Sequence, residues 1–196
     1  MKILIWILIS VSIAGACLAD GKDGFLNGNL FTIAYSNVTT ASIKKIGTVT
    51  YVILPLNLKR SIEQKFPNFR LPISSDYKDV KFSGQEKGEV AVIDEIPFVA
   101  FGDFHHTGKQ DIAISLVNKE DPKTWQTIIF QEISNEYIPS FLSDVGNSYM
   151  LGIAEDGVPS DGNNHDCLEL IEWESASVDY CWDGEKFIVQ PDGSGE

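Results

Sequence analysis

Residues 98–118 read FVAFGDFHHTGKQDIAISLVN, and this stretch decides the fold more than any other part of the chain. Two short apolar runs, 98–101 and 112–117, flank a polar loop at 102–111. Short apolar runs that are separated by glycine and aspartate are typical of strands joined by a loop. The stretch therefore predicts a strand–loop–strand unit within a β-rich domain.

The loop in this unit carries oxygen-bearing side chains at the spacing of a calcium-binding loop. Asp103 takes the first position, Gly108 the sixth and Asp111 the ninth. In loops of this kind, oxygen ligands at alternating positions surround a hard cation, and a glycine makes the sharp turn. The candidate metal ligands are therefore Asp103, His105, Thr107 and Asp111.

The sequence from Gly102 to Ile112 resembles the central motif of FG-GAP and VCBS-type repeats, in which the loop typically reads G-D-F-N-G-D-G-K-x-D. Members of that family usually repeat the motif to form the blades of a β-propeller, and the loop often binds calcium. The resemblance is confined to residues 98–118, and the chain has no second clear copy. It therefore implies a single hairpin of the family's kind and not a full propeller.

Two loop positions depart from the family pattern and weaken the expected metal site. His105 stands where the family has Asn or Asp, and Thr107 stands where it has Asp. Imidazole is a poor ligand for a hard cation, and a hydroxyl group carries no charge. Two interpretations stay open. Either the loop is a weak calcium site, or it is a metal-free turn in which Asp103 and Thr107 hydrogen-bond loop amides and Asp111 caps the next strand.

The remaining sequence predicts further strands and one main helix. Strands are expected at 30–35, 46–55, 124–133, 149–153 and 187–189. Leu58, Ile62 and Phe66 recur every four residues and predict a helix over 56–66, whose apolar stripe docks onto a sheet. The segment 135–144 fits neither pattern clearly. Sequential hairpins with one helix predict a mainly β fold with antiparallel hairpins, of the α+β kind with one main helix.

The N-terminal residues 1–19 have the features of a secretory signal peptide. Lys2 precedes an apolar run, 3–16, that is shorter than the roughly 20 residues of a transmembrane helix. Cys17 directly follows small residues, as in a bacterial lipoprotein leader, so lipidation at Cys17 is an alternative to simple cleavage. We expect the mature protein to be a single β-rich domain, 20–196, without a transmembrane span.

The chain has three cysteines, and loss or lipidation of Cys17 would leave one pair. Cys167 and Cys181 flank a predicted hairpin with arms at 168–173 and 178–182. A disulfide across this hairpin is expected if the register places the two cysteines opposite each other. The alternative is a free thiol that serves as a nucleophile or a metal ligand.

The formal net charge of −13 restricts the classes of partner. Such a surface repels phosphate backbones and anionic membranes, so nucleic acid is not an expected partner. Metal ions and basic proteins are the natural electrostatic match. The acidity also serves to keep an exported protein soluble.

The sequence contains no G-x-S-x-G elbow, no P-loop and no dinucleotide fingerprint, so we predict no catalytic residues and no cofactor beyond weakly bound calcium. We expect an exported, non-enzymatic binding or structural protein that acts through protein–protein contacts. It would be periplasmic or attached to the outer membrane in a Gram-negative bacterium, and secreted otherwise. One alternative is an inhibitor or immunity-type partner of a secreted hydrolase. Another is a metal-dependent hydrolase with its site at His105, His106 and His165.

Overall fold

The structure is a computed structural model of the whole chain. It describes residues 23–26, 29–47, 49–73, 76, 96–145, 149–154, 166–172 and 176–190. The predictions for the leader, for Cys17 and for His165 lie outside these residues.

Strands and a single helix make up most of the described residues. In chain order they are β1 (Asp23–Leu26), β2 (Asn29–Ser36), β3 (Ser42–Ile46), β4 (Val49–Pro55), α1 (Leu56–Lys65), β5 (Phe69–Arg70), β6 (Val99–Gly102), β7 (Asp111–Asn118), β8 (Trp125–Ile133), β9 (Glu136–Val145), β10 (Tyr149–Ala154), β11 (Cys167–Glu172), β12 (Ala176–Trp182) and β13 (Phe187–Gln190). This confirms the predicted mainly β fold with one main helix, and the described residues form no closed barrel or propeller.

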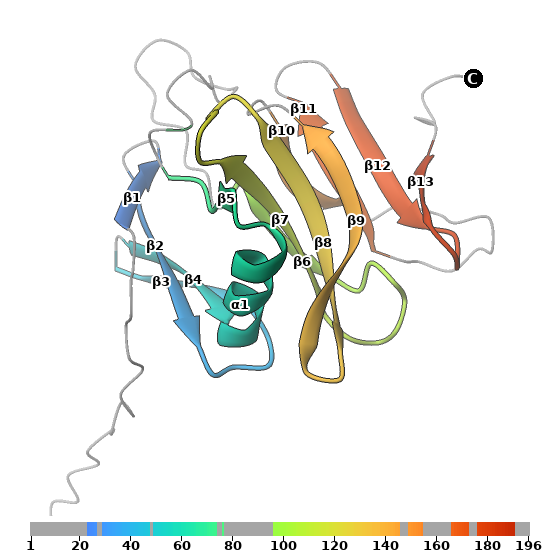
Figure 1. Cartoon of the computed structure of the whole chain (residues 1–196), viewed down its shortest axis with the longest axis horizontal. Helices are drawn as coiled ribbons and strands as arrows, with labels where there is room; N and C mark the ends of the chain where they lie inside the picture. The colour runs from blue at the N-terminus through green and yellow to red at the C-terminus, as the bar shows by residue number, and fades with distance from the viewer. Residues whose placement is uncertain are drawn as a thin grey trace, which may run out of the picture.

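The strands build three sheets, which we call the N-terminal, central and C-terminal sheets. Their strand orders are β1-β2-β4-β3, then β5-β7-β8-β9 with β6 also paired to β7, and then β10-β11-β12-β13. The central sheet lies between the other two (Figure 1). One hydrophobic core joins it to the N-terminal sheet and α1, and a second joins it to the C-terminal sheet.

Strand β7 is covered on both faces, which explains its uninterrupted apolar sequence. β8 pairs along one of its edges, while β6 and β5 share the other. Ile112 and Ile114 belong to the core on the N-terminal side, whereas Ala113 belongs to the core on the C-terminal side. A strand that is buried on both faces needs no polar alternation. The strand–loop–strand unit expected at 98–118 is therefore present as β6, its loop and β7.

Helix α1 packs between the N-terminal and central sheets with the predicted stripe turned inward. Leu58 and Ile62 are buried, and Phe66 packs edge to face on Phe130 with ring centroids 6.0 Å apart. Burial of each large apolar side chain stabilises the fold by about 1.5–3 kcal/mol. No helix among the described residues is both long enough and apolar enough to cross a membrane.

Three details differ from the sequence-based expectations. The strand expected at 46–55 is divided into β3 and β4 by a turn at Gly47, and Ile46 beside that turn is 65% exposed. Strand β4 pairs with β2 in parallel, so the fold is not purely antiparallel. The ambiguous segment 135–144 lies almost entirely in β9, which forms one edge of the central sheet as described. Pro139 is tolerated there because an edge strand with a register shift does not need every backbone N–H.

Candidate functional site

The loop between β6 and β7 folds around the first of its predicted metal ligands. Asp103 Oδ1 accepts a hydrogen bond from the Thr107 amide at 2.7 Å, and its Oδ2 accepts one from the Gly108 amide at 2.6 Å. The Thr107 hydroxyl lies 3.5 Å from the same Oδ1. Gly108 has a φ of 75°, a conformation that favours glycine. Both oxygens of Asp103 therefore hold the shape of the turn, the role that the metal-free interpretation gives them.

The third and ninth loop positions form a separate, buried pair. Asp111 Oδ2 accepts hydrogen bonds from the His105 amide at 2.9 Å and from the His105 ring Nδ1–H at 2.7 Å. The two side chains are only 3% and 1% exposed. Among the described residues, neither Asp111 Oδ1 nor His105 Nε2 has a hydrogen-bond partner. In a calcium loop the ninth-position side chain faces the cation. Here the Asp111 carboxyl group is instead hydrogen-bonded to the His105 ring.

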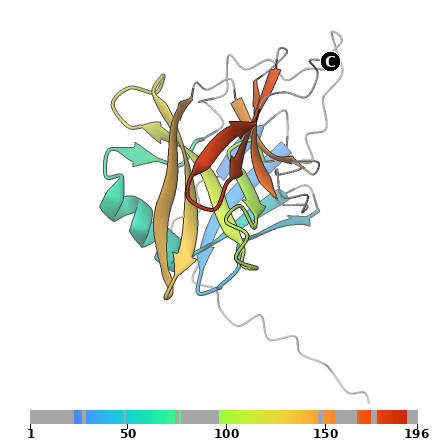
Figure 2. The same ribbon diagram turned by 90° about the vertical axis from the view of Figure 1, so that its right-hand side faces the viewer.

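Aromatic side chains from the C-terminal sheet cover this pair. The His105 ring lies 4.7 Å from the ring of Trp182 and 5.0 Å from that of Phe187, measured between centroids. Figure 2 shows the β12–β13 hairpin next to the loop that follows β6. Gly102 at the start of the loop admits no side chain cheaply, because an added Cβ would come within 3.0 Å of the Phe104 ring. The loop is therefore packed into the fold.

The predicted ligands form two pairs, not one cluster. Asp103 lies with Thr107, and His105 lies with Asp111. Within the described part of the chain, no three His, Cys, Asp or Glu side chains are grouped so that they could hold a metal ion. His165, which the hydrolase alternative requires, is not among the described residues. Weak calcium binding and the metal-dependent hydrolase therefore stay predictions.

The two C-terminal cysteines are joined in the predicted way. Cys167 and Cys181 form a disulfide between β11 and β12, with their Cα atoms 4.6 Å apart. The register pairs Leu168 with Tyr180, which places the cysteines directly opposite each other one position further along. That Cα spacing is the one expected for a non-hydrogen-bonded antiparallel pair. The bond lies next to Trp182, one of the two rings that cover His105.

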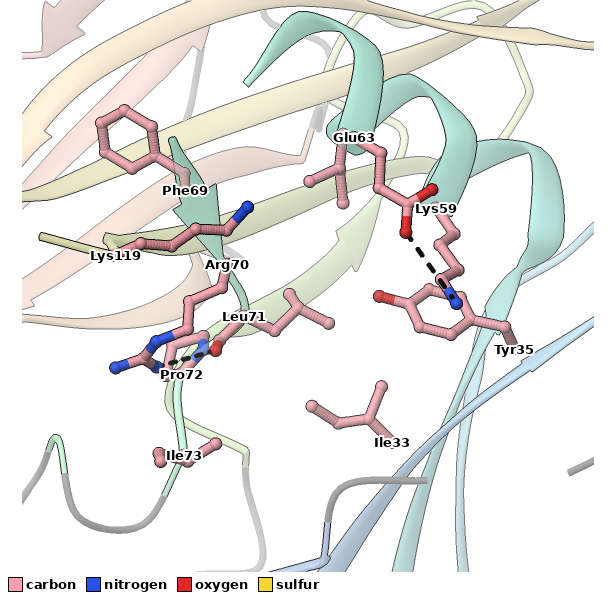
Figure 3. A pocket seen from close by; sticks show the side chains of 11 residues that line it. Ile33, Tyr35, Lys59, Glu63, Phe69, Arg70, Leu71, Pro72, Ile73 and Lys119 are labelled. Atoms are coloured by element: carbon pink, nitrogen blue, oxygen red, sulfur yellow. Dashed lines mark hydrogen bonds and ion pairs between the residues drawn. The ribbon is translucent and has the colours of Figure 1, made fainter. Parts of the chain in front are cut away.

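A cavity of about 270 Å³ lies between α1, β2 and the segment that begins with β5 (Figure 3), and sequence reasoning missed it. The apolar part of its lining consists of Ile33, Ile62, Phe69, Leu71, Pro72 and Ile73. The polar part consists of Tyr35, Lys59, Glu63, Arg70 and Lys119. The lining of the cavity thus combines apolar side chains with three cationic groups.

Tyr35 and two helix residues form one side of the cavity. The Lys59 ammonium lies 5.3 Å from the centre of the Tyr35 ring and 3.9 Å from the Glu63 carboxylate. Burial raises the pKa of the Tyr35 hydroxyl well above its ordinary value, and the charge of Glu63 raises that pKa further. The hydroxyl therefore stays protonated at physiological pH and is available as a donor.

Arg70 and Asp76 fix the opposite wall. The Arg70 guanidinium donates to both oxygens of Asp76, at 2.6 and 2.8 Å, and the Ile73 amide donates to Asp76 at 2.7 Å. Burial raises the pKa of Asp76, but the hydrogen bonds from Arg70 and Ile73 outweigh it and hold that pKa below its ordinary value. Lys119 donates to the Pro67 carbonyl and has no ion pair with any described residue.

The distribution of charge along the sequence is the signal that could have pointed to this cavity. Residues 29–73 contain six basic residues and one acidic residue, whereas 166–190 contain seven acidic residues and one basic residue. The N-terminal sheet and α1 are therefore basic within a chain whose net charge is −13. A single net charge for the whole chain conceals this division.

Comparison with protein-family models, with curated proteins and with solved structures finds no match for this chain. Function is therefore inferred from the geometry and charge of the chain itself.

Proposed function

We propose that this chain is an exported, non-enzymatic binding protein that docks a basic protein partner on its C-terminal sheet. The FG-GAP-like loop is a structural part of that protein. The observation that carries the proposal is the concentration of acidic residues in 166–190, the segment that forms β11 to β13. Opposite charges on two proteins accelerate their encounter and set their relative orientation.

The hydrogen bonds and ring contacts of the loop side chains support a role other than catalysis. Asp103 is engaged by two backbone amides, and His105 and Asp111 are paired with each other beneath aromatic rings. A catalytic acid, base or metal ligand has to reach a substrate. In this loop the side chains that could do such chemistry are instead engaged in holding the fold.

The edge of the C-terminal sheet offers a surface for a partner. β13 is the terminal strand of that sheet among the described residues, so one side of its backbone is open. Ile188 and Val189 on this strand are 36% and 55% exposed. In the adjoining turn, amides of Lys186 and Glu185 donate to Asp183 and hold the pKa of its carboxyl below its usual range, so this group remains ionised. An open strand edge with apolar side chains and surrounding carboxylates suits an extended, basic segment of a partner protein.

Affinity capture with charge-reversed variants tests this proposal. The mature protein would be immobilised and exposed to the extracytoplasmic fraction of its own source cells at physiological salt. Glu169→Lys with Glu185→Lys should abolish capture of a basic protein, while Glu120→Lys with Glu136→Lys, which makes the same change of charge elsewhere, should retain it. The proposal fails if both variants capture the same protein equally well, or if no basic protein is captured. A captured hydrolase that loses activity on binding would support the inhibitor alternative.

Intact mass of the protein from that fraction tests export. The proposal expects the mass of a chain that has lost residues 1–19, or one that begins with a lipidated Cys17. A chain with its N-terminal segment intact in the cytosol contradicts the proposal.

A further inference from the structure

We infer that the cavity between α1, β2 and β5 binds a small amphipathic carboxylate, that is, one carboxylate group on an apolar body such as an aromatic ring or a short alkyl chain. This site lies in the basic part of the chain, away from the acidic sheet proposed to dock a protein partner. It therefore adds a second binding activity to the proposed function.

The size of the cavity limits the ligand. Its volume is about 270 Å³. An engineered apolar cavity of about 150 Å³ holds benzene, so proportion gives a ligand of about ten to twelve non-hydrogen atoms. A phenyl-substituted short-chain acid or a medium-chain fatty acid has this size.

The apolar walls determine the body of the ligand. Ile33 comes from β2, Ile62 from α1 and Leu71 from the segment after β5, so three separate elements supply apolar surface to one space. Figure 3 shows the Leu71 side chain extending from the β5 side of the cavity toward Tyr35 and Ile33. Removal of apolar ligand surface from water contributes about 25 cal/mol per Å². A purely ionic ligand such as phosphate would leave these walls without a partner.

The cationic groups determine the charge of the ligand. The Arg70 charge is balanced by Asp76, and Lys59 lies near Glu63, but Lys119 is not ion-paired with any described residue. Figure 3 shows Lys119 and Lys59 on opposite sides of the cavity. A carboxylate that reaches Lys119 would gain a charge-assisted hydrogen bond, which is roughly twice as strong as a neutral one. A cationic ligand would meet two ammonium groups and only one exposed carboxylate, Glu63.

The Tyr35 hydroxyl adds a neutral hydrogen-bond donor to the lining of the cavity. The tyrosine is half-buried, and its hydroxyl makes no hydrogen bond to any described residue. Figure 3 shows this hydroxyl directed into the cavity. This hydroxyl is not one of the buried polar atoms that lack a partner, so it is accessible to a ligand in the cavity. The hydroxyl is a protonated donor placed to reach a ligand oxygen.

Three probes of nearly equal shape test the inference by calorimetric titration of the mature protein. They are 3-phenylpropionate, its neutral amide and 3-phenylpropylamine. The carboxylate should bind, the amide should bind about tenfold more weakly because it lacks the charge-assisted contact, and the amine should not bind detectably. Equal or tighter binding of the amine overturns the inference. So does failure of the carboxylate to bind at millimolar concentration.

Variants of residues that line the cavity then test whether the carboxylate binds there. Lys119→Ala should weaken carboxylate binding about tenfold and leave amide binding nearly unchanged, while Lys44→Ala, which removes the same charge from an exposed strand, should have no effect. Tyr35→Phe should weaken both ligands severalfold. Leu71→Trp should fill the cavity and block both, with an unchanged circular dichroism spectrum as the control for folding. If Leu71→Trp binds like the unmodified protein, or if amide NMR shifts on titration map away from Ile33, this cavity is not the site.

Discussion

Replacement of His105 by leucine should reduce the free energy of unfolding by about 3–5 kcal/mol, because it breaks a buried histidine–carboxyl pair and leaves one member behind. Asp111 is fully buried, and its Oδ2 would keep only the backbone amide at position 105 as a donor. Its Oδ1 already has no partner among the described residues. Leucine is close to histidine in volume and keeps the contacts with Trp182 and Phe187, so the loss is mainly electrostatic.

A second variant separates the loss of the polar interaction from any loss of side-chain packing. His105→Leu combined with Asp111→Leu removes both polar side chains, and apolar replacement of a whole buried pair is often neutral or stabilising. The backbone amide at position 105 would then lose its acceptor, which costs about 1–3 kcal/mol. The double variant should therefore be more stable than His105→Leu alone by about 2 kcal/mol, the difference between the middles of the two ranges, although it carries one more substitution.

Urea denaturation at pH 7, followed by tryptophan fluorescence with the disulfide intact, measures both quantities. Lys109→Leu is the matched control, since Lys109 is an exposed residue of the same loop and its replacement should change the stability by less than about 0.5 kcal/mol. The reasoning is refuted if His105→Leu costs less than about 1 kcal/mol or if the effects of the two leucines simply add.

Three further predictions concern other parts of the fold. Replacing both Cys167 and Cys181 by alanine should lower the stability by about 3 kcal/mol, the value for a loop of this length, as measured by denaturant titration. Asp76→Asn should cost about 1 kcal/mol at pH 7, after allowance for solvent screening of its arginine partner. Because the folded-state pKa of Asp76 lies below its unfolded value, this difference should be complete above about pH 5 and should disappear as the pH falls through the lowered pKa in thermal melts. His105→Asp with Thr107→Asp should give a chain whose melting temperature rises more with calcium than that of the unmodified protein, since added carboxylates raise calcium affinity; equal rises would contradict this.

The sequence predicted those elements whose structure depends on neighbouring residues. The helix follows from the spacing of Leu58 and Ile62, and the disulfide follows from two cysteines at the ends of one hairpin. The parallel pairing of β2 with β4 was not predictable in this way. It joins residues such as Ile33 and Val52, and the register depends on burial of both strands against a third layer.

The candidate site was only partly predictable, for the same reason. The loop spacing singled out Asp103 and Asp111 as metal ligands or turn residues, and both accept hydrogen bonds from amides of the loop. It did not indicate that His105 would turn inward, because the rings that cover it belong to a hairpin near the other end of the sequence. The cavity has walls from three elements and no local motif. Only the excess of basic residues in 29–73 marked it.

The separation of charge changes what the acidity of this chain implies about its partners. A net charge of −13, treated as uniform, predicts cationic partners over the whole surface. The charges are instead unevenly distributed: the segment 29–73 is basic and the segment 166–190 is acidic, and they contribute mainly to sheets on opposite sides of the central sheet. At physiological salt, charges separated by more than about 8 Å are largely screened from each other. Each end therefore presents its own local potential, so a basic protein at one end and a small carboxylate at the other are compatible within one molecule.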